Sequence, residues 1–408
     1  MTDDLARHER FRRLLVLAAV FVMMVIGIYQ YSWSLFASAI VRELRWDLAT
    51  VGLTFTIFTY TATFIQPLSG HVADTLGPRA VSLVASLLVG LGFLLSSRVS
   101  TPGALYLCYG LGGIGVGVLY GVSAASAIKW FPDRRGAATG LVVFGFGAGT
   151  ALFNWVMQRS LDTYGFRPTL QYIGVAMLLL LVPAVLVYRY PPAHWEDMLR
   201  TSGRSKAPAV DFTPPEMLRT YQWFLIYFCF AFTVSIVLLF GAQLKMLSAE
   251  YGISATHFSV LLVLFPLGNG LSRLLAGAVS DRLGRERTMV LFYSLLGVSV
   301  LSLLQFGHSA VFFVTLVFVA ALLGGAPFAL YPATIGDYYG TKYATVNYGI
   351  TYTAKAWAGL MSGWLSGYIV TQFGSYRIAL LLIAVGSLAA AALSSPRCMR
   401  RPTRKAAG

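Results

Sequence analysis

Long apolar runs separated by short breaks form the main pattern of this chain. A helix needs about 20 apolar residues to cross roughly 30 Å of hydrocarbon. Runs of this length lie near residues 14–37, 49–72, 80–98, 103–127, 137–158, 168–188, 221–244, 255–279, 288–306, 310–335, 345–370 and 375–395. The breaks hold charged residues together with Gly and Pro, which end helices. The pattern predicts an all-α membrane protein with twelve transmembrane helices.

The longest polar stretch, residues 189–220, divides the twelve runs into six and six. We therefore expect an N-terminal six-helix half (1–188), a cytoplasmic linker (189–220) and a C-terminal six-helix half (221–408). The first run is too long for the core of a signal peptide, and no small-residue cleavage pattern follows it. We expect it to remain as the first helix.

The composition supports a membrane protein. Hydrophobic residues make up 57% of the chain, charged residues 12%, and the mean hydropathy is +0.69. Soluble domains are about 45–50% apolar and about 25% charged, so the composition excludes a soluble protein, a disordered chain and a free-standing DNA-binding domain. The cysteines, Cys108, Cys229 and Cys398, are far apart, which predicts neither a disulfide framework nor a metal site.

The formal net charge of +15 reflects orientation in the membrane. With the N-terminus in the cytoplasm, 22 of the 31 Lys and Arg fall on the cytoplasmic side and seven on the other. Cytoplasmic loops of membrane proteins carry such an excess of Lys and Arg. We expect a multi-pass protein of the inner cell membrane with both termini in the cytoplasm. We attribute the positive charge to this orientation and to contact with anionic lipid at the bilayer surface. Nucleic acid is not an expected partner.

One segment occurs twice, 207 residues apart. It reads GHVADTLGPR at residues 70–79 and GAVSDRLGRE at residues 277–286. The positions shared by the two copies are Gly70 with Gly277, Asp74 with Asp281, and Gly77 with Gly284. Each copy follows the second run of its half, so we expect two halves of the same topology related by pseudo-symmetry. We interpret the segment as a tight turn and a conformational latch on the cytoplasmic side, the alternative being an ordinary turn.

Two cations, Arg273 and Lys355, lie inside apolar runs. A rise of about 1.5 Å per residue puts them roughly 12 Å and 15 Å from the cytoplasmic ends of their helices. A charge there costs at least about 2.5–3.5 kcal/mol, and no Asp or Glu lies near the middle of a run. We predict that the two cations hold an anion, the guanidinium through two hydrogen bonds and the ammonium as a point charge. A neutral Lys355 satisfied by hydroxyl groups is the alternative.

Polar and aromatic residues at a similar depth are predicted to line the site. They are Gln30, Tyr31, Tyr120, Asn269, Tyr348, Thr351 and Tyr352. Asn269 lies one helical turn before Arg273, and Tyr352 one turn before Lys355. Tyrosine can donate a hydrogen bond to a carboxylate while offering it an apolar face. For each aromatic residue alone, helix packing or lipid contact is the alternative role.

The repeated segment resembles the G-x-x-x-D-x-x-G-x-R signature of the major facilitator superfamily. KWFPDRRGAATGLVVFGFGAG (129–149) is similar to the monocarboxylate and oxalate/formate carriers of that superfamily. The stretches QYSW (30–33), GVLYG (117–121), NYG (347–349) and TAKA (353–356) are similar to them too. The resemblance implies the major facilitator fold and alternating access by rocking of the two halves. It also implies a site for small carboxylates at Arg273, Lys355, Gln30–Tyr31 and Tyr120.

The size of the substrate is predicted from the same resemblance. The oxalate carriers have further aromatic residues at the positions of Gly324, Phe328 and Tyr352. A glycine at 324 is expected to widen the cavity, which favours a larger acid such as lactate or pyruvate over oxalate. An oxalate/formate-type dicarboxylate exchanger remains the alternative, and Gly324→Trp is expected to favour the smallest acids.

Other classes of function find little support in the sequence. GLGGIG (110–115) lies within an apolar run with no preceding strand, so we interpret its glycines as a helix-packing stripe rather than a dinucleotide site. We expect no enzyme and no cofactor, and a monomer whose partners are a small carboxylate anion and the bilayer. Protons are a candidate second partner, because the chain fits either anion exchange or proton symport. A membrane receptor for carboxylates and a multidrug or cation exporter are the competing functions. The exporter requires buried acids, and no Asp or Glu lies near the middle of a run.

Overall fold

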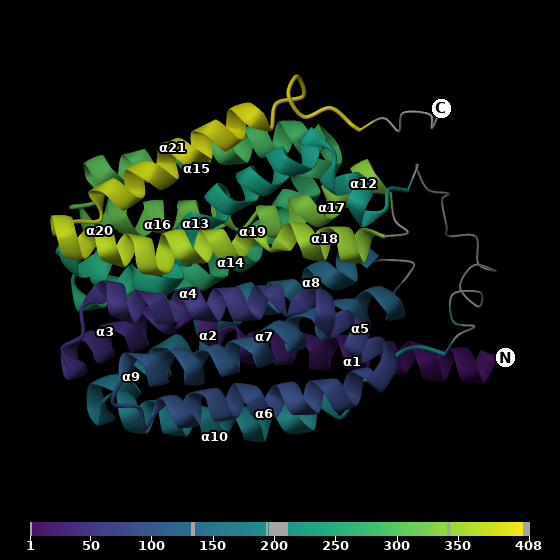
Figure 1. The fold of residues 1–408 in the computed structure, drawn as a ribbon, viewed down its shortest axis with the longest axis horizontal. Coiled ribbons are helices and arrows are strands. Elements are labelled where there is room, and N and C mark those ends of the chain that lie inside the picture. Colours follow the sequence, from purple (N-terminus) through teal and green to yellow (C-terminus); the bar gives the residue numbers. More distant parts are fainter. Residues whose placement is uncertain (1, 132–134, 193–194, 196–210, 341–342, 403–408) are drawn as a thin grey trace.

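The computed structural model describes residues 2–131, 135–192, 195, 211–340 and 343–402, and the regular elements in this part of the chain are all helical. Figure 1 shows long helices running side by side, with both termini at one end of the bundle. We call that end the termini side and the other end the opposite side. The helices before the linker form one half of the bundle, and those after it form the other.

The first six passes alternate between the two sides. They are α1 (Thr2–Ile26), α2 (Ile28–Tyr31) and α3 (Trp33–Leu44); α4 (Leu48–Phe64) and α5 (Gln66–Leu76); α6 (Pro78–Ser96); α7 (Pro102–Trp130); α8 (Arg135–Ala148), the 3-10 turn η1 (Gly149–Leu152) and α9 (Asn154–Tyr164); and α10 (Phe166–Val185).

The last six passes repeat this arrangement after the short helix α12 (Pro214–Leu218). They are α13 (Tyr221–Glu250); α14 (Ala255–Leu283); α15 (Arg285–Phe306); α16 (Ala310–Gly324) and α17 (Pro327–Tyr339); α18 (Ala344–Tyr352), α19 (Ala354–Leu360), the π turn η2 (Met361–Leu365) and α20 (Ser366–Phe373); and α21 (Arg377–Leu393).

The predicted twelve-helix fold is confirmed, with differences in how single passes are built. In the described part of the chain, nine helical spans are long and apolar enough by themselves to cross a membrane, and α4 with α5, bent by 45°, makes a tenth. The eleventh pass is interrupted between residues 344 and 373, and the twelfth, α21, has only 17 residues. About half of the predicted linker 189–220 lies outside the described ranges.

Several passes are broken near the middle of the bundle. Pro67 and Pro327 stand in the first turns of α5 and α17. Proline is tolerated there because the N–H it lacks would have no partner within the helix. The same residue ends the preceding helix, because its ring clashes with the backbone one turn earlier. The eleventh pass breaks at Thr353, two residues before Lys355. Broken helices within a membrane are tolerated where they line a cavity or are buried in protein. The breaks therefore mark the depth at which a transport site is expected.

The two halves are joined mainly on the opposite side. There α4 packs against α19, η2 and α20 of the other half. Thr56 Oγ1 donates to the Gly359 carbonyl (3.2 Å) and accepts from the Trp364 N–H (3.0 Å). Glycines permit this approach, because a Cβ added at Gly363 would lie 2.7 Å from the Gly52 carbonyl. The opposite side is closed in this structure.

Candidate functional site

Arg273 is buried near the middle of α14, with 3% of its surface exposed. Its Nη1 donates to the carbonyl of Val143 on α8, which belongs to the other half. Its Nε and Nη2 have no hydrogen-bond partner in the structure. The guanidinium carbon lies 4.9 Å from the ring centroid of Phe328, a favourable cation–π distance. Two donors of a buried cation thus remain available to an anion.

Lys355 is the second residue of α19, just after the break at Thr353, and is 2% exposed. Its ammonium makes one long hydrogen bond, 3.4 Å to the Tyr352 hydroxyl. It lies 5.6 Å from the Phe146 ring and 5.5 Å from the Tyr352 ring. Within the described ranges no carboxylate is in ion-pair distance of Lys355 or Arg273. No carboxylate in the described part of the chain compensates either charge.

Aromatic rings from both halves surround the two cations. Tyr120 on α7 lies 5.8 Å from Tyr352, ring centroid to ring centroid, across the boundary between the halves. Tyr31 lies 5.5 Å and Tyr120 5.1 Å from Phe146. Phe328 lies 6.1 Å from Tyr352. The structure thus brings the predicted aromatic residues together around Arg273 and Lys355.

Unpartnered polar atoms gather in the same region. Both amide atoms of Gln30, the hydroxyl of Tyr31 and both amide atoms of Asn269 are buried without a hydrogen-bond partner. Each such group costs about 1–3 kcal/mol when it stays unsatisfied, and native proteins contain few of them. Such unsatisfied buried groups are typical of a site that binds a polar ligand or ordered water.

The expectation that Gly324 widens the cavity is not met in this structure. A Cβ added at Gly324 would lie 2.8 Å from Ile236 Cγ2 and 2.9 Å from Val237 Cγ2, both on α13. Gly324 therefore permits close packing of α16 on α13 rather than facing the cations. Phe328, in contrast, contacts Arg273 as described. Gly324 therefore gives no support to a larger acid.

Phe146 and the Val143 carbonyl were not predicted as site groups. Phe146 touches Tyr31, Tyr120 and Lys355 at once. Its sequence signal was its place in the LVVFGFGAG stretch, two residues before the end of α8. A phenylalanine in an apolar run resembles any lipid-facing residue, so the sequence alone did not distinguish it.

The repeated segment forms the predicted tight turns. Gly77 has φ 85° and ψ 146°, and Gly284 has φ 88° and ψ 158°, backbone conformations that glycine alone adopts readily. Gly70 and Gly277 are helical instead, and a Cβ added there would meet nothing within 4 Å. The shared glycines thus differ: one of each copy makes the turn, and the other is not needed for packing in this state.

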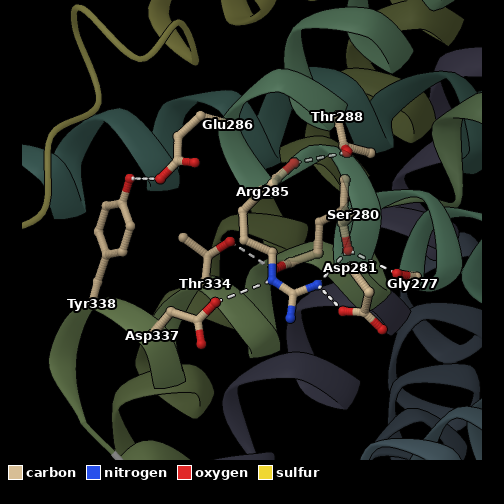
Figure 2. Close-up of polar contacts among 11 residues, drawn as sticks. Gly277, Ser280, Asp281, Arg285, Glu286, Thr288, Thr334, Asp337 and Tyr338 are labelled. Atoms are coloured by element: carbon tan, nitrogen blue, oxygen red, sulfur yellow. Dashed lines mark hydrogen bonds and ion pairs between the residues drawn. The ribbon is translucent and has the colours of Figure 1, made fainter. Parts of the chain in front are cut away.

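Ion pairs link each shared aspartate to the fourth pass of its own half, directly in the first copy and through Arg285 in the second. Asp74 pairs with Lys129 at the end of α7. In the second copy Arg285 lies between Asp281 (2.8 Å) and Asp337 of α17 (3.1 Å), as Figure 2 shows. These bonds lie within the halves, so a latch between the halves stays a prediction.

We expect Gly77→Ala and Gly284→Ala to destabilise the protein by about 1–3 kcal/mol, because a Cβ is strained in this region of backbone space. Thermal unfolding in detergent measures the effect. Gly70→Ala is the matched control, since it lies in a helix with open space around it. Unfolding of Gly284→Ala at the wild-type temperature would contradict the assigned strain.

The comparisons with known proteins agree with this architecture. The Major Facilitator Superfamily model matches residues 15–244 and 223–407. The oxalate:formate antiporter of Oxalobacter formigenes is 33% identical, with 96% of this chain and 93% of that protein covered. Monocarboxylate transporter 13 of Rattus norvegicus is 26% identical, with 92% and 86% covered.

Solved structures agree as well. The nucleoside transporter NupG has a TM-score of 0.70 at 16% identity, covering 93% of this chain and 98% of that one. The xylose transporter XylE from E. coli, in a partially occluded inward-open conformation, has a TM-score of 0.71 at 15% identity, covering 94% and 97%. These likenesses show the fold. With the family model matching nearly the whole chain and a 33% identical antiporter aligned over 96% of it, the chain is an integral membrane protein that belongs to the Major Facilitator Superfamily.

Proposed function

We propose that this transporter carries small organic carboxylates by alternating access, with Arg273 and Lys355 holding the carboxylate. One observation carries the proposal: two buried cations have no carboxylate partner among the described residues, while donors around them have no acceptor. The guanidinium suits a carboxylate through two parallel hydrogen bonds. The name of the 33% identical relative supports the same class of cargo.

Two kinds of carboxylate remain in competition. Lactate and pyruvate have no support from a wide cavity at Gly324, because α16 packs closely on α13 there. A dicarboxylate such as oxalate supplies two negative charges for two cations, so the charge balance favours it. A monocarboxylate leaves one positive charge when both side chains are charged, and none when Lys355 is neutral.

The coupling follows from the same charges. An empty site holds two cations that repel each other at mid-depth. A bound substrate anion reduces this repulsion, so we expect the empty carrier to change between its two states more slowly than the loaded one. This favours exchange of one anion for another for a dicarboxylate, and proton symport for a monocarboxylate. We further propose that the termini side faces the cytoplasm of a cell with this protein in its inner membrane, in line with the excess of Lys and Arg there.

Transport into proteoliposomes tests the proposal. We expect liposomes loaded with unlabelled acid to take up labelled oxalate, formate, lactate or pyruvate at rates at least about tenfold above protein-free liposomes. A parallel panel of a sugar, a nucleoside and an organic cation is expected to give none. Binding of carboxylates without any uptake would favour a receptor, and uptake of the neutral panel alone would overturn the proposal.

The driving force is tested with liposomes that contain no substrate. Lactate accumulation driven by an inward proton gradient, without internal anion, indicates symport. Uptake that requires internal anion and ignores the gradient indicates exchange. We expect the second result for oxalate. Oxalate accumulation in empty liposomes, driven by protons alone, would contradict obligatory exchange of the dicarboxylate.

A further inference from the structure

Lys245 makes a hydrogen bond between the halves near the surface of the opposite side. It stands on α13, five residues before that helix ends at Glu250. Its Nζ donates to Gln158 Oε1 on α9 of the other half (2.8 Å). The side-chain amide of Gln158 in turn donates to Asp162 (2.7 Å). A lysine therefore helps to hold the opposite side closed.

The partner of Lys245 is a neutral amide. Among the described residues no carboxylate lies within ion-pair distance of Lys245. The charged groups that act on it are Asp162 and Arg42, with opposite effects, and the Phe258 ring lies 5.9 Å away. Gln158 accepts from one of the three N–H donors of the ammonium. The positive charge of Lys245 is thus only partly satisfied.

Lys245 is aligned with the candidate site. It lies one helical turn from Gly241, on the same face of α13. A Cβ added at Gly241 would lie 2.8 Å from the carbonyl of Gln30, a residue whose buried side-chain amide has no hydrogen-bond partner. One turn is about 5.4 Å along the helix axis. Lys245 thus stands about one turn from the level of Gln30, on the surface that faces the other half, and about four turns from Phe230, which packs against Tyr352 and Phe328 beside the cations.

Alternating access requires that the opposite side opens. When the opposite side opens, α9 moves away from α13 and Lys245 loses its hydrogen bond to Gln158. Its ammonium is then left without that acceptor at the entrance on the opposite side. A carboxylate is a stronger acceptor for it than an amide. We propose that Lys245 is the first contact for the anion on the opposite side, and that it exchanges Gln158 for the incoming carboxylate. This inference rests on the proposed function.

The experiment measures transport separately from each side, in right-side-out and inside-out proteoliposomes. For Lys245→Gln we expect the KM for anion supplied at the opposite side to rise about tenfold, with weaker dependence on ionic strength, because the attracting charge is gone. The KM for anion supplied at the termini side is expected to stay within about twofold. Lys245→Arg is expected to restore most of the loss.

Gln158→Leu separates the charge from the bond. It removes the bond between the halves and leaves Lys245 charged, so we expect no rise in the KM at the opposite side. Arg159→Gln is the matched control, because Arg159 is an exposed cation on the same helix, stacked on Trp155 5.7 Å away. It is expected to leave the KM on both sides unchanged.

The outcomes are distinct. Equal effects of Lys245→Gln and Gln158→Leu on maximal rate, with the KM at the opposite side unchanged, would show that Lys245 is only a tie and overturn the inference. A rise in KM for Arg159→Gln as large as that for Lys245→Gln would overturn it too, because the effect would then be a general surface charge. Absence of carboxylate transport by the wild type would instead refute the proposed function.

Discussion

Arg273→Gln and Lys355→Gln are each expected to remove most carboxylate binding. Loss of one member of a buried, hydrogen-bonded charge pair costs about 2–5 kcal/mol, which is at least about thirtyfold in affinity. Arg273→Lys is also expected to fail, because an ammonium cannot grip a carboxylate through two parallel bonds. Isothermal titration or ligand-induced thermal stabilisation of the purified protein measures the loss.

A folding defect is separable from a binding defect here. Each Gln variant removes an uncompensated buried charge, so the ligand-free variants are expected to unfold at or above the wild-type temperature. Wild type is expected to gain stability on adding the acid, and the variants are not. Arg159→Gln again serves as the charge-matched control. Wild-type affinity in both Gln variants would refute the site assignment.

Gly359→Ala is expected to hold the carrier open on its opposite side. A Cβ added at Gly359 would lie 2.6 Å from the Thr59 Cβ on α4, so the two halves cannot close there without shifting. Overpacking of this kind costs about 1–3 kcal/mol, a shift of roughly five- to 150-fold in the open–closed equilibrium. The exchange rate is expected to fall by a similar factor while binding from the opposite side is retained.

Chemical labelling follows the opening directly. Thr56→Cys, in a background with the three native cysteines replaced, places a thiol in the closed contact, where Thr56 is only 5% exposed. A membrane-impermeant thiol reagent is expected to label it faster in Gly359→Ala. Gly349→Ala is the control on the same pass, because its Cβ would lie 3.5 Å from Pro67, an ordinary contact. Equal labelling rates in the two variants would contradict the proposed block.

Features set by length, hydropathy or backbone chemistry were predictable from the sequence. The twelve passes follow from apolar runs, and the tight turns at Gly77 and Gly284 follow from a repeated glycine. Arg273 and Lys355 could be singled out because a charge in an apolar run has few explanations. Each of these signals is carried by residue type and position along the chain, without knowledge of which way a side chain points.

Features that depend on rotation about a helix axis were not predictable. The run that contains Gly324 is apolar on every face, so nothing in it distinguishes the surface toward α13 from the surface toward the cations. The same holds for Phe146 on α8. The Val143 carbonyl could not be found at all, because every residue has one, and only the approach of α14 to α8 selects it.

That both buried charges belong to protein side chains has an electrical consequence. They belong to the protein and do not cross the membrane, so the charge moved in a cycle is that of the cargo alone. Exchange of a dianion for a monoanion moves one elementary charge, worth about 2.3 kcal/mol per 100 mV of membrane potential. Exchange of like anions, or entry of a monocarboxylate with its proton, moves none. The choice of cargo therefore decides whether this carrier generates voltage for the cell or works independently of it.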